Sequence, residues 1–305
     1  RMVRRSVLPL TSQPYLPSLS RARPIVGPIV GAGGRSVRGA ACEIEIRGEP
    51  RDGKLAVARM VGPGEGGPRL LAPPPDLPSI LLGLARDAEL VEGRLARAAA
   101  DEAEAEVLET IHPLPDGGSL AIEPTRALTA VDVDLGDRQG ADAKRVTRQA
   151  NLTALAETAR LLRLKGLGGI VVIDLVGRGH DGPALLAAAR LAFAADNPGV
   201  AIGPVGRFGT MELLIPRRIR PLAEFLRDSR DVLTDRALAQ RLVRRLESEA
   251  LARPGARLKA VCAPSVARAA AAFGGALADR YGARYRSARA PDRKSTRLNS
   301  SHRMP

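Results

Sequence analysis

The sequence predicts a mixed α/β fold organised around a central sheet, and three observations support this prediction. Between residues 118 and 215, short apolar segments alternate with segments of helical periodicity, an order that is typical of α/β domains. Residues 142–165 place most of their apolar side chains at helical spacing and keep arginines off that stripe. Residues 170–176 are apolar on both alternating sets of positions, which predicts a central strand covered on both faces.

The other elements are expected from the same two periodicities. Alternating apolar and charged residues predict a half-buried strand at 41–47, and a second strand is expected at 55–61. Further strands are expected at 118–122, 127–134, 200–205, 210–215, 258–263 and 283–289, and helices at 79–85, 88–108, 183–195, 235–252 and 264–280. Gly166, Gly168 and Gly169 end the long helix.

Composition divides the chain into six parts. The first is rich in Pro, Gly, Ser and Arg without periodicity, which is typical of disordered chain. The last, RKSTRLNSSHRMP, fits nothing before it and resembles translated adapter sequence. The expected parts are 1–37, disordered or not native to the fold; 38–62, strands; 63–109, a Gly/Pro linker and helices; 110–222, an α/β domain; 223–292, a small α/β appendage; and 293–305, an adapter-derived tail.

The charge of the chain favours a polyanionic partner. Its formal net charge is +14, and nearly all the positive charge is arginine, whose planar fork grips phosphate at two points. Nucleic acid is the usual partner of such a protein, and arginine-rich coding bias is the alternative explanation. Two distant cysteines without a CxxC pair favour a cytoplasmic protein with no cysteine zinc site. No apolar run approaches the roughly 18 residues of a membrane span.

Two carboxylates stand out because each lies at the end of an apolar strand. Asp132 and Asp174 occupy these positions, and Asp134 follows on the same face of the first strand. Burying an unpaired charge is costly, so each acid needs a partner. A divalent cation is the expected partner, and Mg²⁺ needs only one or two carboxylates. A strand-end cap or a salt bridge is the alternative role for either acid.

Three sequence blocks in a fixed order resemble the ribonuclease E/G family of bacterial endoribonucleases. They read GGSLAIEPTRALTAVDVD (117–134), ANLTALAETARLLRLKGLGGIVVID (150–174) and GRFGTMEL (206–213). The likeness covers roughly residues 110–222 and extends more weakly over 38–60 and 255–290. It implies a DNase I-like or RNase H-like core that hydrolyses single-stranded, AU-rich RNA with Mg²⁺ during RNA processing or decay.

The resemblance also implies roles for individual residues. Asp132 and Asp174 would hold the Mg²⁺ that activates the attacking water, and Asp134, where the family has Asn, would be a third or outer ligand. The expected RNA-binding residues are Arg207, Phe208, Asn151, Arg163 and Lys165. Bland alternatives stay open: Arg207 could pair with Glu212, Phe208 could be a core residue, and Asn151 an ordinary helix residue. The basic residues of 142–165 could form a solvated face.

The chain departs from the family pattern at several points. Residues 221–235 contain no cysteine where the family has its CPxC zinc-link, so no zinc-dependent assembly is expected, although an oligomer remains possible. The S1 RNA-binding domain would be at most a remnant at 38–62, and the pocket for a 5′-monophosphate has no clear match. These departures leave two rival hypotheses, namely a catalytically inactive RNA-binding relative and an interaction protein with an incidental basic surface.

Overall fold

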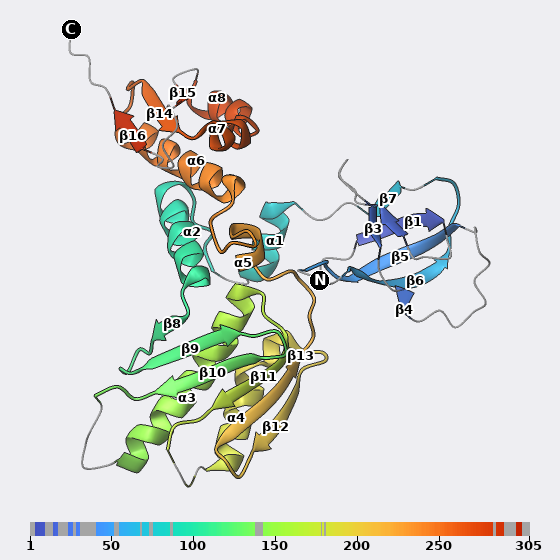
Figure 1. Ribbon diagram of the computed structural model, residues 1–305, viewed down its shortest axis with the longest axis vertical. Helices are drawn as coiled ribbons and strands as arrows, with labels where there is room; N and C mark the ends of the chain where they lie inside the picture. The colour runs from blue at the N-terminus through green and yellow to red at the C-terminus, as the bar shows by residue number, and fades with distance from the viewer. Residues whose placement is uncertain are drawn as a thin grey trace. The chain divides into compact units, whose positions relative to one another are not determined.

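The structure of the chain is a computed structural model, shown in Figure 1. It describes residues 4–9, 15–17, 24–26, 29–30, 41–51, 55–67, 69–72, 76–85, 88–137, 143–177, 179, 181–282, 285–289 and 297–300. The chain forms two compact units, of which the first is Arg1–Ala88 with Val107–Leu222 and the second is Glu89–Glu106 with Ala223–Pro305. In the described part of the chain, no helix combines the length and apolar character needed to cross a membrane.

A six-stranded mixed sheet is the centre of the first unit. Its strands, in the order β12-β13-β11-β10-β9-β8, are β12 (Ala201–Val205), β13 (Thr210–Ile215), β11 (Gly169–Asp174), β10 (Thr129–Asp134), β9 (Ser119–Pro124) and β8 (Ile111–Pro113). Only β10 and β11 pair in parallel, and the other neighbours are antiparallel. A parallel pair needs a long crossover, which the helix α3 (Ala143–Lys165) provides. The predicted mixed α/β fold is therefore confirmed.

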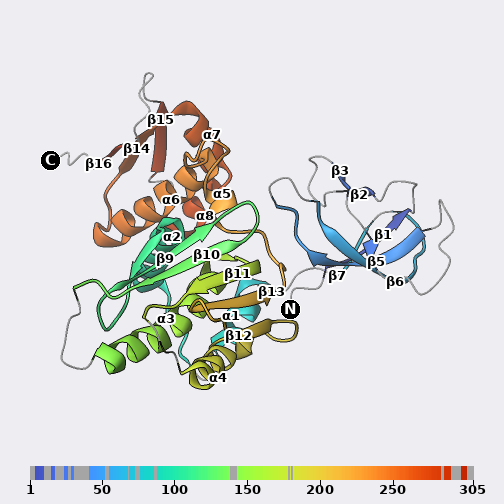
Figure 2. The same ribbon diagram turned by 60° about the horizontal axis from the view of Figure 1, so that its bottom comes forward.

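The core of this unit lies between the sheet and two helices on one of its faces. Figures 1 and 2 show α3 and α4 (Gly182–Ala192) together on the same side of the strands. Leu155, Leu161 and Ile173 are fully buried in the contact, as is Phe193 after α4. Period-two alternation on the strands and period 3.6 on α3 aim these side chains at one another.

The other face of the sheet is open, which corrects the prediction that residues 170–176 are covered on both sides. Ile170 on β11 is 49% exposed and Leu214 on β13 is 53% exposed. The β11 burial pattern alternates strictly between buried and more exposed positions. An apolar strand sequence does not reveal which face a helix will cover, so the error follows from composition alone.

A five-stranded sheet precedes the central sheet in the first unit. Its order is β4-β6-β5-β1-β7, with β4 (Ile29–Val30), β6 (Val57–Pro63), β5 (Ala41–Gly48), β1 (Arg4–Pro9) and β7 (Arg69–Ala72). Two further strands, β2 (Tyr15–Pro17) and β3 (Pro24–Val26), pair with each other, and the helix α1 spans Leu77–Ala85. Strands β5 and β6 confirm the two predicted there. Strands β1 to β4 differ from the disorder expected over 1–37, and β7 lies in the expected linker.

The second unit combines α2 (Gly93–Leu108) with the chain after residue 222. It contains α5 (Ala223–Leu226), α6 (Asp235–Ala252), α7 (Pro264–Ala271), α8 (Gly274–Tyr281) and a sheet of order β15-β14-β16, from Tyr285–Arg289, Leu258–Cys262 and Arg297–Ser300. The single helix predicted over 264–280 is thus two helices. Strand β16 pairs with β14, although it lies in the tail expected to be foreign to the fold.

Both cysteines are buried and free, Cys42 in β5 and Cys262 in β14. Burial raises the pKa of each thiol, so the reactive thiolate is scarce at neutral pH. We expect a soluble thiol reagent to label neither cysteine in the folded protein and both in urea. Stoichiometric labelling without denaturant would contradict the buried positions of these two strands.

Candidate active site

The two acids singled out in the sequence lie side by side at the carboxyl ends of the parallel strands. The register of β10 and β11 pairs Asp132 directly with Asp174. Because paired residues on neighbouring strands share a face and the strands lie about 4.8 Å apart, the two carboxylates project from adjacent points. Val131, Val133 and Ile173 alternate with them and are buried on the helix side, so both acids face the open side.

Neither acid has a cationic partner among the residues that the structure describes. No hydrogen bond or ion pair involves Asp132 or Asp174 there, which leaves the salt-bridge alternative without support. Two adjacent carboxylates repel one another, and a divalent cation would offset that repulsion. Oxygen ligands suit Mg²⁺, so this pair fits the ion. In the described ranges no cluster of three or more His, Cys, Asp or Glu residues forms a larger metal site.

Asp134 shares the face of Asp132 but has a local structural role. Its Oδ1 accepts a hydrogen bond of 2.9 Å from the backbone N–H of Gly136, which closes the turn after β10. Gly118 lies against the same turn with a φ of +78°, and a Cβ there would collide with the carbonyl oxygen of Asp134. The function of Asp134 as a third metal ligand stays a prediction.

The turn between β12 and β13 stands beside Asp174. Thr210, the first residue of β13, is the register partner of Asp174, and the backbone N–H of Leu175 donates to the carbonyl of Gly209 at 3.2 Å. The N–H of Gly206 donates to the carbonyl of Thr210 at 2.8 Å, which closes the turn. The two residues carried at its tip, Arg207 and Phe208, are therefore fixed at the same edge of the sheet as the acids.

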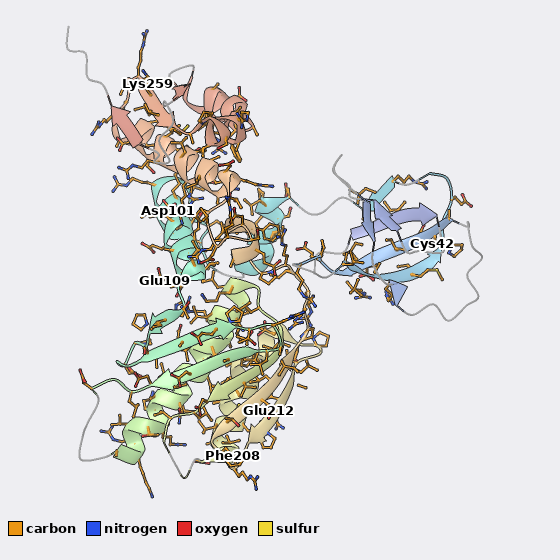
Figure 3. All side chains as sticks on the ribbon, in the orientation of Figure 1. Cys42, Asp101, Glu109, Phe208, Glu212 and Lys259 are labelled. Carbon is orange, nitrogen blue, oxygen red and sulfur yellow. The ribbon has the colours of Figure 1, made fainter. Side chains whose placement is uncertain are left out.

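Phe208 is exposed, so the alternative of a core phenylalanine is wrong. It is 78% exposed, and the guanidinium of Arg207 lies 4.5 Å from the centroid of its ring. Figure 3 shows Phe208 beyond the end of β13, while Glu212 lies on the strand itself. No ion pair between Arg207 and Glu212 occurs in the described residues. Stacking against the ring leaves the edge of the guanidinium able to contact phosphate.

Glu212 is a further acid on the open face that the sequence interpretation treated only as a possible partner of Arg207. It is exposed, lies two residues after Thr210, and is paired in register with Val172. Alternation along β13 therefore brings it to the same face as Asp174. Period two in TMELLI is the signal that indicates this position.

Three residues of α3 do not lie at the site as expected. Asn151 is 1% exposed and Lys165 is 5% exposed, and the ammonium of Lys165 donates to the carbonyls of Val107 at 3.0 Å and Glu109 at 2.6 Å. Arg163 donates to a carboxylate oxygen of Asp196 at 2.7 Å. Because α3 covers the face opposite the acids, the expectation that these side chains contact RNA at the site is corrected.

Comparison with known proteins follows this geometry. Residues 89–218 match the Ribonuclease E/G family, a match that begins earlier than the resemblance over 110–222 and includes most of α2. Ribonuclease E of Escherichia coli (strain K12) is 36% identical over 114 residues, which are 36% of this chain and 11% of that protein. Ribonuclease E of Haemophilus influenzae is 33% identical over 148 residues, 45% of this chain and 16% of that protein.

A plant relative matches the same part of the chain. The Ribonuclease E/G-like protein, chloroplastic, of Arabidopsis thaliana is 34% identical over 119 residues, which are 37% of this chain and 12% of that protein. The chain thus spans less than a fifth of the length of each of these three relatives.

Proposed function

We propose that this chain, whose residues 89–218 are a ribonuclease E/G family domain, is an endoribonuclease that hydrolyses phosphodiester bonds of single-stranded RNA with Mg²⁺. The observation that carries the proposal is the register pairing of Asp132 with Asp174 on an open sheet face, without a cationic partner in the described chain. The proposal extends to RNA processing or decay in the cytoplasm, and to the AU preference that the family resemblance implies.

Asp132 and Asp174 would hold the metal, and Asp134 would stand close enough to orient a water molecule. Mg²⁺, when bound, would neutralise charge on the phosphate and make a coordinated water more acidic. The two carboxylates belong to rigid neighbouring strands, so their separation is set before substrate arrives. Such preorganisation is what a reaction dominated by charge stabilisation requires.

Arg207 and Phe208 would bind the RNA beside the metal. Arg207 supplies a guanidinium for the scissile phosphate, and Phe208 offers an exposed ring face to an unstacked base. Only single-stranded RNA can splay a base onto such a ring while its phosphate reaches the acids. The open sheet face, with Ile170 and Leu214 exposed, leaves room for the strand.

Removal of the Phe208 ring should weaken RNA binding without abolishing cleavage. A base stacked on an aromatic side chain contributes about 1–3 kcal/mol, so Phe208→Ala should raise the KM for RNA about tenfold. The kcat should stay within about threefold, because the ring does not touch the reacting phosphate. Leu191→Ala, at a comparably exposed residue on α4, is the control and should change neither constant. An unchanged KM in Phe208→Ala would refute the stacking role.

The test of the function is cleavage of a labelled single-stranded RNA with Mg²⁺ and with EDTA. We expect cleavage that needs Mg²⁺ and leaves a duplex of the same sequence largely intact. RNA that is bound equally well in both conditions and never cut would favour the catalytically inactive RNA-binding relative. Binding that disappears at moderate salt, with no preference among nucleic acids, would indicate an incidental basic surface.

A further inference from the structure

The three residues that follow Asp174 are each held in place by a different contact. On one side, the N–H of Leu175 donates to Gly209 in the turn that carries Arg207 and Phe208. On the other side, the Asn151 side chain makes two hydrogen bonds to the backbone of Val176. Its Nδ2 donates to the Val176 carbonyl at 3.0 Å, and its Oδ1 accepts from the Val176 N–H at 3.1 Å.

Gly177 completes this arrangement against the same face of α3. Its φ is +91°, and a Cβ at this position would lie 2.5 Å from Cγ2 of Thr147, which is one helical turn before Asn151. The chain can approach the helix this closely only because residue 177 has no side chain. Helix α3 therefore fixes both Val176 and Gly177, immediately beyond the end of β11.

The chemistry of the asparagine amide explains why it suits this position. Strand β11 ends at Asp174, so the N–H and C=O of Val176 need other partners. An amide side chain presents one donor and one acceptor and can satisfy both groups of a single residue. Asn151 is 1% exposed, so little water competes with these bonds. It takes the place of a neighbouring strand for one residue.

We propose that Asn151 is a positioning residue, which fixes the end of β11 through Val176 and thereby sets the Asp174 carboxylate against that of Asp132. The proposal rests on the proposed function, because it gives that pair of acids a required spacing. Without the amide, the strand end would be held only by the ladder and by Leu175. Asp174 lies two residues from Val176, so its carboxylate would lose its fixed position before the fold is lost.

The first experiment compares Asn151→Leu with Leu155→Ala in the full chain. Leucine has nearly the volume of asparagine but can bond neither group of Val176. Leu155 is fully buried one turn further along α3 and has no described contact with the segment after β11, so its truncation measures instability alone. We expect Asn151→Leu to lower kcat about 10–100-fold, as loss of a residue that orients a metal ligand does, with KM for RNA nearly unchanged. Leu155→Ala should keep kcat per folded molecule.

The second readout needs no RNA. Mn²⁺ can replace Mg²⁺ as a paramagnetic probe, and its free fraction is measured by electron paramagnetic resonance. Asn151→Leu should weaken Mn²⁺ binding about tenfold or more, whereas Leu155→Ala should leave the affinity unchanged. Wild-type protein that binds Mn²⁺ but cleaves no RNA would end the proposed function, while weaker Mn²⁺ binding by Asn151→Leu alone would still support the positioning role.

A double variant keeps the proposal testable if Asn151→Leu fails to fold. Gly177→Ala should lower kcat and Mn²⁺ affinity, because the new methyl collides with Cγ2 of Thr147. Adding Thr147→Ser removes that methyl and should restore part of both losses, the rest being the strain of a positive φ. Equal kcat and Mn²⁺ affinity in wild type, Asn151→Leu and Gly177→Ala would overturn the proposal, as would wild-type protein that binds no Mn²⁺ at all.

Discussion

Asp174→Asn is expected to lower kcat for RNA cleavage by about 10³-fold. The carboxylate is one of two that would hold the ion, and a bound metal contributes several kcal/mol of transition-state charge stabilisation, or about three powers of ten in rate. Asparagine has the same shape, and Asp174 is exposed without a described partner, so stability should not change. The KM for RNA should stay within about threefold, because Arg207 and Phe208 remain in place. Asp132→Asn should behave in the same way.

Two matched variants make this result specific. Glu123→Gln removes an exposed carboxylate from β9, where residue 123 pairs with Ala130 at the far end of β10, and should leave kcat unchanged. Asp134→Asn should retain activity within about threefold, because the amide oxygen can still accept the hydrogen bond from Gly136. A similar loss in Asp174→Asn and Glu123→Gln would mean that only the overall charge of the face matters, and the assigned metal pair would be wrong.

The elements that sequence reasoning located best are those whose packing partner is close in the chain. The helix expected at 142–165 spans Ala143–Lys165, and the hairpin around Pro124 forms β9 and β10. Strands with distant partners were missed. Strand β1 pairs with β5 across more than thirty residues, and neither periodicity nor composition in 4–9 indicates that pairing. Tertiary context decides such strands, so local propensity cannot find them.

The site shows the same division between local and distant signals. Alternation within one strand places Asp132 and Asp134 on a common face, and the family resemblance identifies Asp174 as the partner of Asp132. Asn151 was expected to touch RNA because the same resemblance singles it out. Its true contact is the backbone of Val176, 25 residues away, and no sequence pattern announces a side chain that replaces a strand.

Glu104→Ala is expected to destabilise the second unit by about 3 kcal/mol, because it leaves two arginines with a broken, poorly solvated ion-pair network. Glu104 on α2 is largely buried, and its carboxylate accepts from Nε of Arg241 at 2.5 Å and from Nη2 of Arg244 at 2.5 Å. Arg244 also pairs with Asp101, and Arg97 on the same helix pairs with Glu247. These contacts join α2 to α6 within the second unit.

Urea unfolding, followed by circular dichroism, measures this effect against a control on the same helix. Glu102 is exposed and has no described ion pair, so Glu102→Ala should change the free energy of unfolding by less than about 0.5 kcal/mol. Because α2 lies within residues 89–218 yet packs on the chain after residue 222, loss of Glu104 should lower the urea midpoint of α6 while cleavage by the folded protein persists. Equal midpoints in Glu104→Ala and Glu102→Ala would show that apolar packing alone joins α2 to α6.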